Sequence, residues 1–315
     1  MNNKLIDNIV WWIPIKKIRD KVKLNLYQKY DYDANIISTL EYKLKKLTPQ
    51  PFIDIIELDI SEHCNLNCYS CSHFSQLSNE QYYDLEIFEN DIKQLSQITY
   101  GLINRFHVMG GEPLLNKNCT DYFYILRKYF NKSNIWLVTN GILLTNQNKN
   151  FWLSCKDNNI EIHPTKYPIN INWDKIHKIS KEFGVVIDFF NNSNTKDDNF
   201  INESIKFILD INGNMDSYNN FTNCWEGNNC IHLKNGKIYT CSRIPNIWKF
   251  NNFFSKNLEV TPLDYIDIYK VKNYNEILNF LSKPIPFCRY CDFYKTRGIG
   301  SWKKSSKIIE EYIDK

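Results

Sequence analysis

The clearest regularity in the chain is an alternation between short apolar runs and stretches in which apolar residues recur every three or four positions. The runs are typical of buried strands, and they lie at residues 52–60, 103–108, 134–141, 160–163 and 185–190, with 206–211 as the candidate for a sixth. Between them, apolar stripes at helical spacing run through Phe88, Ile92, Leu95 and Ile98 and through Phe123, Leu126 and Phe130. Strands that alternate with helices predict an α/β fold whose parallel strands are joined by right-handed crossovers.

The first fifty residues lie outside this alternation and predict a helical lead. Pro14 suits a first helical turn, and Ile15, Ile18 and Val22 then share one face of a helix. Aromatic and basic residues around an amphipathic helix suit peripheral contact with an anionic membrane surface. Because the same apolar face would also suit packing across the rest of the protein, the sequence leaves both interpretations open.

Composition and charge limit the classes of function. A chain of 315 residues with 43% hydrophobic residues can bury a full barrel and a smaller domain. Its net charge of +4 is small for this length and comes mostly from lysine, so no nucleic-acid partner is expected. The apolar run 9–15 is too short to span a bilayer, and no small-residue cleavage site accompanies it. We therefore expect a cytoplasmic protein in which clustered cysteines indicate a metal site rather than disulfides.

Three cysteines follow the first apolar run with a spacing that suits an iron–sulfur cluster. Cys64, Cys68 and Cys71 form a Cys-x3-Cys-x2-Cys pattern. Three thiolates this close can hold three corners of one [4Fe–4S] cube and leave the fourth iron open to a small molecule. A zinc knuckle fits less well, because zinc sites usually take cysteines in pairs with a fourth ligand. A disulfide cluster or a chance grouping of cysteines could also produce this spacing.

Polar or glycine residues end the next two predicted strands. Gly110, Gly111 and Glu112 end the run 103–108, where the glycines let the backbone approach a ligand and the carboxylate can meet an ammonium group. Thr139 and Asn140 end the third run and can hydrogen-bond a ribose or a carboxylate, although a capping turn would have the same residues. In a barrel of parallel strands joined by helices, the chemistry lies at the C-terminal ends of the strands. These residues and the cysteine triplet are therefore expected on one rim.

Together the triplet and the glycine turn resemble the radical SAM superfamily, over residues 52–215. The resemblance implies an open, partial (β/α)6 barrel in which the triplet holds a [4Fe–4S] cluster. It also implies that the glycine turn, with Glu112 on the amino group, and Thr139 with Asn140 contact S-adenosylmethionine (SAM). One departure is Ser70, where the family usually places an aromatic residue near the adenine.

A second group of cysteines follows the predicted barrel. Its members are Cys224, Cys230, Cys241, Cys288 and Cys291. The Asn-Gly dipeptide at 235–236 predicts a two-residue hairpin turn, and counting outward from it puts Lys234 opposite Lys237. The same register puts Cys230 opposite Cys241, and a predicted helix at 274–281 leads to the last pair. Taken alone, this arrangement suits a zinc ribbon and an iron–sulfur cluster equally.

Beside a radical SAM core, this second group resembles the SPASM type of auxiliary domain in its shortened form, called Twitch. The resemblance implies a second, auxiliary [4Fe–4S] cluster with Cys241, Cys288 and Cys291 as ligands. Cys224 and Cys230 then compete for the fourth place. The predicted domains are a helical lead at 1–50, a radical SAM core at 51–215 and a Twitch-like or SPASM-like auxiliary cluster domain at 216–315.

Two cysteines lie outside both groups. Cys119 stands at a predicted helix start, where the helix dipole favours a thiolate, and it is a candidate for a catalytic residue. Cys155 lies in the predicted connection 148–157 and is expected to be a packed apolar residue.

The resemblance implies an enzyme that cleaves SAM to a 5′-deoxyadenosyl radical, which then takes a hydrogen atom from the substrate, with electrons from a donor such as flavodoxin or ferredoxin. An auxiliary cluster with four cysteine ligands suits acceptance of the substrate's electron, which favours an oxidoreductase. The residues at 11–19 resemble leaders of proteins from bacterial surface-polysaccharide loci, so a sugar or sugar-like substrate is expected. The alternatives are a peptide-modifying maturase, a radical sugar epimerase with a cysteine hydrogen donor, and a zinc-stapled binding module without enzymatic activity.

Overall fold

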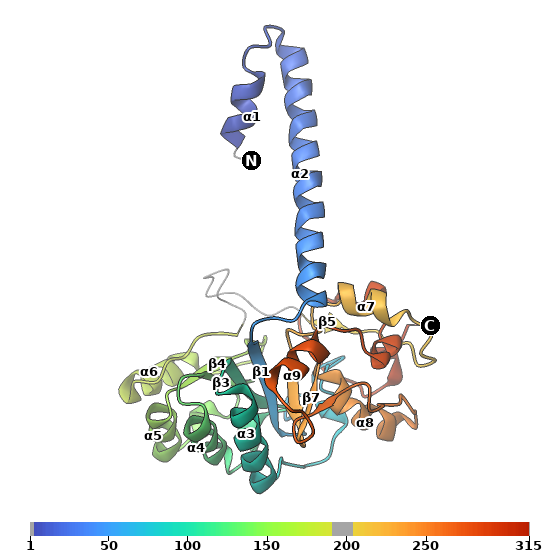
Figure 1. The fold of residues 1–315 in the computed structure, drawn as a ribbon. Coiled ribbons are helices and arrows are strands. Elements are labelled where there is room, and N and C mark those ends of the chain that lie inside the picture. The colour runs from blue at the N-terminus through green and yellow to red at the C-terminus, as the bar shows by residue number, and fades with distance from the viewer. Residues whose placement is uncertain (1–2, 191–203, 315) are drawn as a thin grey trace. The chain divides into compact units, whose positions relative to one another are not determined.

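The computed structural model describes residues 3–190 and 204–314 and divides into two compact units, Met1–Thr48 and Pro49–Lys315. The first unit consists of α1 (Asn3–Val10) and α2 (Lys16–Leu47), joined by a turn (Figure 1). Ile6 and Val10 are buried, whereas Trp11 and Trp12 in the turn are exposed. The predicted helical lead is therefore a pair of helices, and its contact with a membrane stays a prediction.

The second unit is built on a seven-stranded sheet in the order β4-β3-β2-β1-β6-β7-β8. Its parallel part consists of β1 (Ile53–Ser61), β2 (Ile103–Gly110), β3 (Asn134–Thr139) and β4 (Ile160–Pro164). The short strand β6 (His232–Lys234) joins β1 in parallel, and β7 (Lys237–Tyr239) and β8 (Ile266–Asp267) follow in antiparallel pairing. Such strands are buried on both faces, which explains why they read as apolar runs.

Four helices alternate with the parallel strands and follow one another along the sheet (Figure 1). They are α3 (Leu85–Thr99), α4 (Cys119–Tyr129), α5 (Lys149–Asp157) and α6 (Trp173–Phe183). The predicted stripe of α3 is buried, with Phe88, Ile92 and Leu95 fully covered. The α/β fold class is confirmed. The stretch 148–157 is not a plain connection, because Asn148 caps a helix there by accepting a hydrogen bond from the amide of Phe151.

The last two predicted strands differ from the expectation. Residues 185–190 lie parallel to β4 and share backbone hydrogen bonds with it, although they form a bridge, Ile162 to Ile187, rather than a full strand. The prediction of a sixth parallel strand at 206–211 is wrong. The chain there forms β5 (Ile205–Lys206), which pairs in antiparallel fashion with β9 (Arg297–Gly298) in a separate sheet. The C-terminal part of the chain supplies a partner that the local sequence pattern could not show.

The predicted hairpin is present, with Lys234 opposite Lys237. It belongs to the same sheet as the parallel strands, so the domain boundary expected between residues 215 and 216 stays a prediction. Three further helices complete the unit, namely α7 (Ser217–Asn223), α8 (Arg243–Phe254) and α9 (Tyr274–Leu281), the last as predicted. A second apolar core joins α8 to the C-terminal residues around Phe74, Phe250 and Tyr312.

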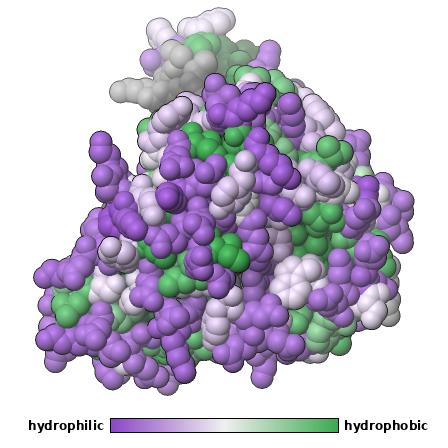
Figure 2. Space-filling model, turned by 60° about the horizontal axis from the view of Figure 1, so that its bottom comes forward, coloured by the Kyte–Doolittle hydropathy of each residue, from purple (hydrophilic) through white to green (hydrophobic). Residues whose placement is uncertain are grey.

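The surface gives two further observations. On the face that Figure 2 shows, hydrophilic residues predominate among those described, and the hydrophobic ones form small separate areas. No helix within residues 3–190 and 204–314 is long and apolar enough to cross a membrane.

Candidate functional site

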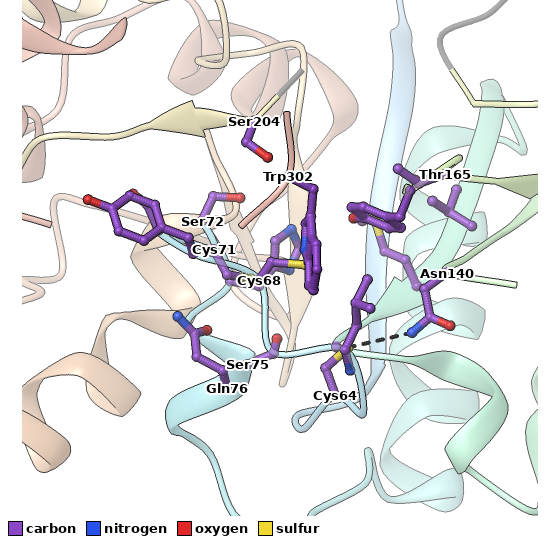
Figure 3. Close-up of a pocket in the computed structure, with 18 of the residues that line it drawn as sticks. Cys64, Cys68, Cys71, Ser72, Ser75, Gln76, Asn140, Thr165, Ser204 and Trp302 are labelled. Atoms are coloured by element: carbon purple, nitrogen blue, oxygen red, sulfur yellow. Dashed lines mark hydrogen bonds between the residues drawn. The ribbon is translucent and has the colours of Figure 1, made fainter. Parts of the chain in front are cut away.

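A cavity of about 300 Å³ lies at the C-terminal ends of the parallel strands (Figure 3). It is reached by the cysteine loop (residues 64–71) after β1 and by the ends of β2 and β3. The predicted site residues that line it are Cys64, Cys68, Cys71, Gly110, Gly111, Thr139 and Asn140. The structure therefore brings the three cysteines, the glycine turn and the end of the third strand to one place.

Thiols of the cysteine loop are largely buried and have hydrogen-bond donors beside them. Sγ of Cys64 accepts from the amide of Leu66 at 3.4 Å and from Nδ2 of Asn140 at 3.7 Å (Figure 3). Burial raises the pKa of Cys68 to about 12, and it also raises the pKa of Cys64. Such thiols lose their protons when a cation binds beside them, and the iron of a cluster supplies that positive charge.

The donor set fits a cluster better than a lone ion. Three thiols on one cavity can each hold a different iron of a [4Fe–4S] cube and leave the fourth iron for SAM. Among the described residues, no group of three His, Cys, Asp or Glu side chains is arranged to hold a single metal ion. Three thiols that line one cavity therefore fit the cluster that the sequence predicts.

Gly110 and Gly111 are required by the chain that they pack against. A Cβ atom at Gly110 would overlap the carbonyl oxygen of Ser61, and one at Gly111 would overlap that of His63. The amide of Gly111 also donates to Ser61 at 2.8 Å. These glycines were expected to let the backbone approach a ligand, and in the structure they approach the backbone that leads into Cys64. This contact determines where the cysteine loop begins.

Glu112 lies behind the cavity wall rather than in it. Its side chain is fully buried, and its carboxylate accepts hydrogen bonds from Thr139 Oγ1 at 2.6 Å and from the amides of Asn140 and Leu114 at 2.8 and 3.1 Å. Burial raises the pKa of Glu112 to about 7, and these donors oppose the shift only in part. The geometry therefore supports a role in holding Thr139 and Asn140, and it does not support the predicted direct contact with an ammonium group.

Several residues of the cavity were not found by sequence reasoning. Tyr167 follows β4, and Trp302 comes from the C-terminal part of the chain; their rings meet edge to face with centroids 6.3 Å apart. Ser75 and Gln76 follow the cysteine loop, and their Oγ and Oε1 atoms are buried without a hydrogen-bond partner among the described residues. The serine at position 70 was a signal that aromatic contact had to come from elsewhere, but it could not indicate from where.

A second cavity, of about 30 Å³, lies beside the first. The cysteines that line it are Cys224, Cys241, Cys288 and Cys291. Nη1 of Arg243 donates to Sγ of Cys291 at 3.3 Å, and the same guanidinium pairs with the buried carboxylate of Glu226. Four thiols around one small cavity fit the auxiliary cluster that the sequence predicts, and the charge of Arg243 would stabilise a thiolate there.

Cys230 does not line the second cavity. Its thiol lies near Glu57 instead, and burial, together with the Glu57 carboxylate, raises its pKa well above the ordinary value. The paired register of the hairpin ends at His232 and Tyr239, so the predicted pairing of Cys230 with Cys241 is not formed. Of the two candidates for the fourth ligand, the geometry therefore favours Cys224.

Cys119 does begin a helix, α4, but it lies in the apolar core and does not line either cavity. Burial raises its pKa well above the ordinary value, which outweighs the helix dipole that was expected to favour a thiolate. The geometry does not support the catalytic role predicted for it. Cys155 is fully buried in the same core, as expected of a packed apolar residue.

Comparison with known sequences identifies the middle of the chain. Residues 58–164, which hold the cysteine triplet, the glycine turn and the end of β3, match the Radical SAM superfamily. GTP 3′,8-cyclase of Petrotoga mobilis is 29% identical over 92 residues, or 29% of this chain and 28% of the relative. GTP 3′,8-cyclase of Clostridium acetobutylicum is 31% identical over 93 residues, or 29% of each. The chain thus spans less than a third of the length of these curated relatives.

Solved structures resemble the chain at low identity. The crystal structure of BtrN in complex with AdoMet and 2-DOIA is 16% identical, with a TM-score of 0.46 over 78% of this chain and 94% of BtrN. Native anSMEcpe with bound AdoMet is 18% identical, with a TM-score of 0.35 over 43% of this chain and 42% of that one. The family match covers the cysteine triplet and most of the residues that line the cavity, although Tyr167 and Trp302 lie outside it. By this match, residues 58–164 form a radical SAM domain.

Proposed function

We propose that the chain binds a [4Fe–4S] cluster through Cys64, Cys68 and Cys71 and cleaves SAM beside it. The observation that carries the proposal is that these three thiols share one cavity with the glycine turn and with Thr139 and Asn140. When bound, the cluster supplies the electron that splits SAM into methionine and a 5′-deoxyadenosyl radical. The residues of the cavity would hold SAM beside this cluster and keep water away from it.

We further propose an auxiliary [4Fe–4S] cluster on Cys224, Cys241, Cys288 and Cys291. Its support is that these four thiols line one cavity and that Arg243 donates to one of their sulfurs. A cationic donor at a ligand sulfur stabilises the reduced form of a cluster and so suits an electron acceptor. Phe207 lines both cavities, so an aromatic side chain lies between the two proposed cluster sites.

A sugar or sugar-like substrate fits the polar groups of the first cavity. Ser75 and Gln76 offer buried oxygen atoms that lack partners, and substrate hydroxyl groups can supply the missing hydrogen bonds. Oxidation of one C–OH to C=O would release a hydrogen atom, an electron and the hydroxyl proton. Cleaved SAM would supply the acceptor for the hydrogen atom, and a cluster held by Cys224, Cys241, Cys288 and Cys291 would supply the acceptor for the electron. A redox partner such as flavodoxin or ferredoxin takes up that electron and supplies the one that cleaves SAM.

The alternatives make different demands on the site. An epimerase would need a thiol that returns a hydrogen atom, but within residues 3–190 and 204–314 the cysteines lining the first cavity are the three of the triplet. A peptide maturase would use the same two clusters on a different substrate. A zinc-stapled module would bind zinc at the second cavity and would not turn over SAM.

Metal analysis of anaerobically reconstituted protein tests the proposal. Two cubes predict about eight irons per chain, and replacing the three triplet cysteines together should leave about four. Incubation with SAM and dithionite should yield 5′-deoxyadenosine from the wild type and none from the triple variant. Stoichiometric zinc in place of iron, or SAM cleavage that survives the triple substitution, would reject it. Sugars and short peptides tested as substrates then separate the oxidoreductase from the maturase.

A further inference from the structure

The C-terminal segment (residues 297–314) runs along the cysteine loop and pairs with its backbone. The amide of Tyr69 donates to the carbonyl of Lys303 at 2.9 Å, and the amide of Ser305 donates to the carbonyl of Asn67 at 2.9 Å. Between these two hydrogen bonds, Cys68 takes part in a β-bridge to the same segment. The last part of the chain thus forms an edge along the loop that carries the three cysteines.

This pairing brings the indole of Trp302 to one of the proposed cluster ligands. Nε1 of Trp302 donates to Sγ of Cys68 at 3.2 Å, and Figure 3 shows the two side chains together at the cavity. Tyr167 also lies near this thiol and, like Trp302, opposes the rise that burial causes in the pKa of Cys68. The sulfur of Cys68 therefore has a side-chain donor that comes from outside the cysteine loop.

Glu311 holds the C-terminal segment beside Trp302. Its side chain is buried, and its carboxylate accepts hydrogen bonds from Oγ of Ser305 at 2.7 Å and from the amide of Ser306 at 2.5 Å. These contacts lie three and four positions after Trp302 and fix the turn that follows it. The indole is thus held in place by the fold before any ligand binds.

We propose that Trp302 raises the reduction potential of the SAM-binding cluster by donating its indole N–H to the sulfur of Cys68. A reduced cluster carries one more negative charge, part of which lies on the ligand sulfurs, so a donor to sulfur stabilises the reduced form more than the oxidised form. The proposal rests on the cluster proposed above. It adds that a residue outside the radical SAM domain makes the reduction of this cluster by its electron donor easier.

The Trp302→Phe variant removes the N–H and keeps an aromatic ring beside Cys68. We expect the ratio of reduced to oxidised SAM-binding cluster, at a fixed applied potential, to fall about tenfold, which equals a potential lower by about 59 mV for one electron. The potential is measured by electron paramagnetic resonance during redox titration of the reconstituted full chain. Spectra with and without SAM identify the relevant signal, because SAM changes the signal of the cluster that it binds.

Two further variants separate the hydrogen bond from the rest of the indole, and a third substitution serves as their control. Trp248→Phe is the matched control, because Trp248 lies on α8 and lines a different cavity, and its potential should equal that of the wild type. Trp302→Ala removes the N–H and the cover together, so its cluster should be lost severalfold faster in air. Ser305→Ala keeps Trp302 and every charge but removes a hydrogen bond to the Glu311 carboxylate, so it should lower the potential in the same direction and by less.

The outcomes keep this inference apart from the proposed function. A wild-type chain without a SAM-responsive cluster signal would reject the proposed cluster itself. A Trp302→Phe variant that keeps the signal and iron content but has the wild-type potential would overturn the role of Trp302 alone. If that variant fails to fold, an unchanged potential in Ser305→Ala overturns the inference instead.

Discussion

Replacing Glu112 by glutamine is expected to remove a pH-dependent loss of stability from the chain. Burial raises the pKa of Glu112 from its ordinary 4.5 to about 7, and this difference corresponds to about 3 kcal/mol. Below about pH 4.5 the carboxyl is protonated in both the folded and the unfolded chain, so the free energy of unfolding does not change with pH through Glu112. Above that pH the unfolded chain releases the proton while the folded chain keeps it, so the free energy of unfolding falls until the pH has risen through about 7.

The size of the effect follows from this linkage. Between pH 5.5 and 8.5, the free energy of unfolding of the wild type should fall by about 2 kcal/mol through Glu112 alone, and Glu112→Gln should not share that fall. At low pH the variant should be less stable, because its amide nitrogen faces the backbone N–H of Asn140 and leaves that donor unpaired, at a cost of about 1–3 kcal/mol. The stabilities of the two proteins should therefore converge or cross as the pH rises.

Urea unfolding of anaerobically reconstituted protein at the two pH values measures this difference. Glu86→Gln on the exposed side of α3 is the matched control and should keep the pH dependence of the wild type. Parallel stabilities of the wild type and Glu112→Gln at both pH values would refute the reasoning, since they would show that burial does not hold a proton on Glu112.

Three more changes test the site. Gly111→Ala, whose Cβ would overlap backbone atoms, should lower the free energy of unfolding by about 2 kcal/mol or more and lower the iron content. Gly184→Ala is the control, because its Cβ would meet no neighbour, and it should lower the free energy of unfolding only by a left-handed strain of about 1 kcal/mol. Cys224→Ser should remove about four irons and Cys230→Ser none, and the reverse result in metal analysis would exchange their roles. Arg243→Lys keeps the charge but shortens the reach to the ligand sulfur, so a redox titration should show a lower potential for the auxiliary cluster and an unchanged one for the SAM-binding cluster.

Much of the parallel part of the fold could be predicted from the sequence because its pattern is local. The apolar runs that became β1 to β4 and the stripe of α3 are buried as their periodicity requires. The hairpin at 235–236 was equally readable, since Asn-Gly suits the turn on its own. The cysteine triplet lies within eight residues, so its convergence on one cavity needed no distant partner.

Contacts between distant residues were decided by the tertiary structure. Only packing could show that Glu112 lies behind Thr139, that Cys230 turns toward Glu57, or that Cys119 is enclosed by the apolar core. A hairpin register also extends only as far as both strands stay extended, which is why counting outward from its turn did not place the cysteines beyond it.

The sequence by itself determined the strand and helix pattern, the cysteine triplet and the identity of the glycine turn, because spacing along the chain is enough to express each of them. The tertiary structure decided which groups surround those cysteines. Trp302 reaches Cys68 across 234 positions of sequence, and no periodicity or motif links the two. That contact exists because the C-terminal segment finds its hydrogen-bond partners in the backbone of the cysteine loop, and such pairing depends on the shape of the whole folded unit.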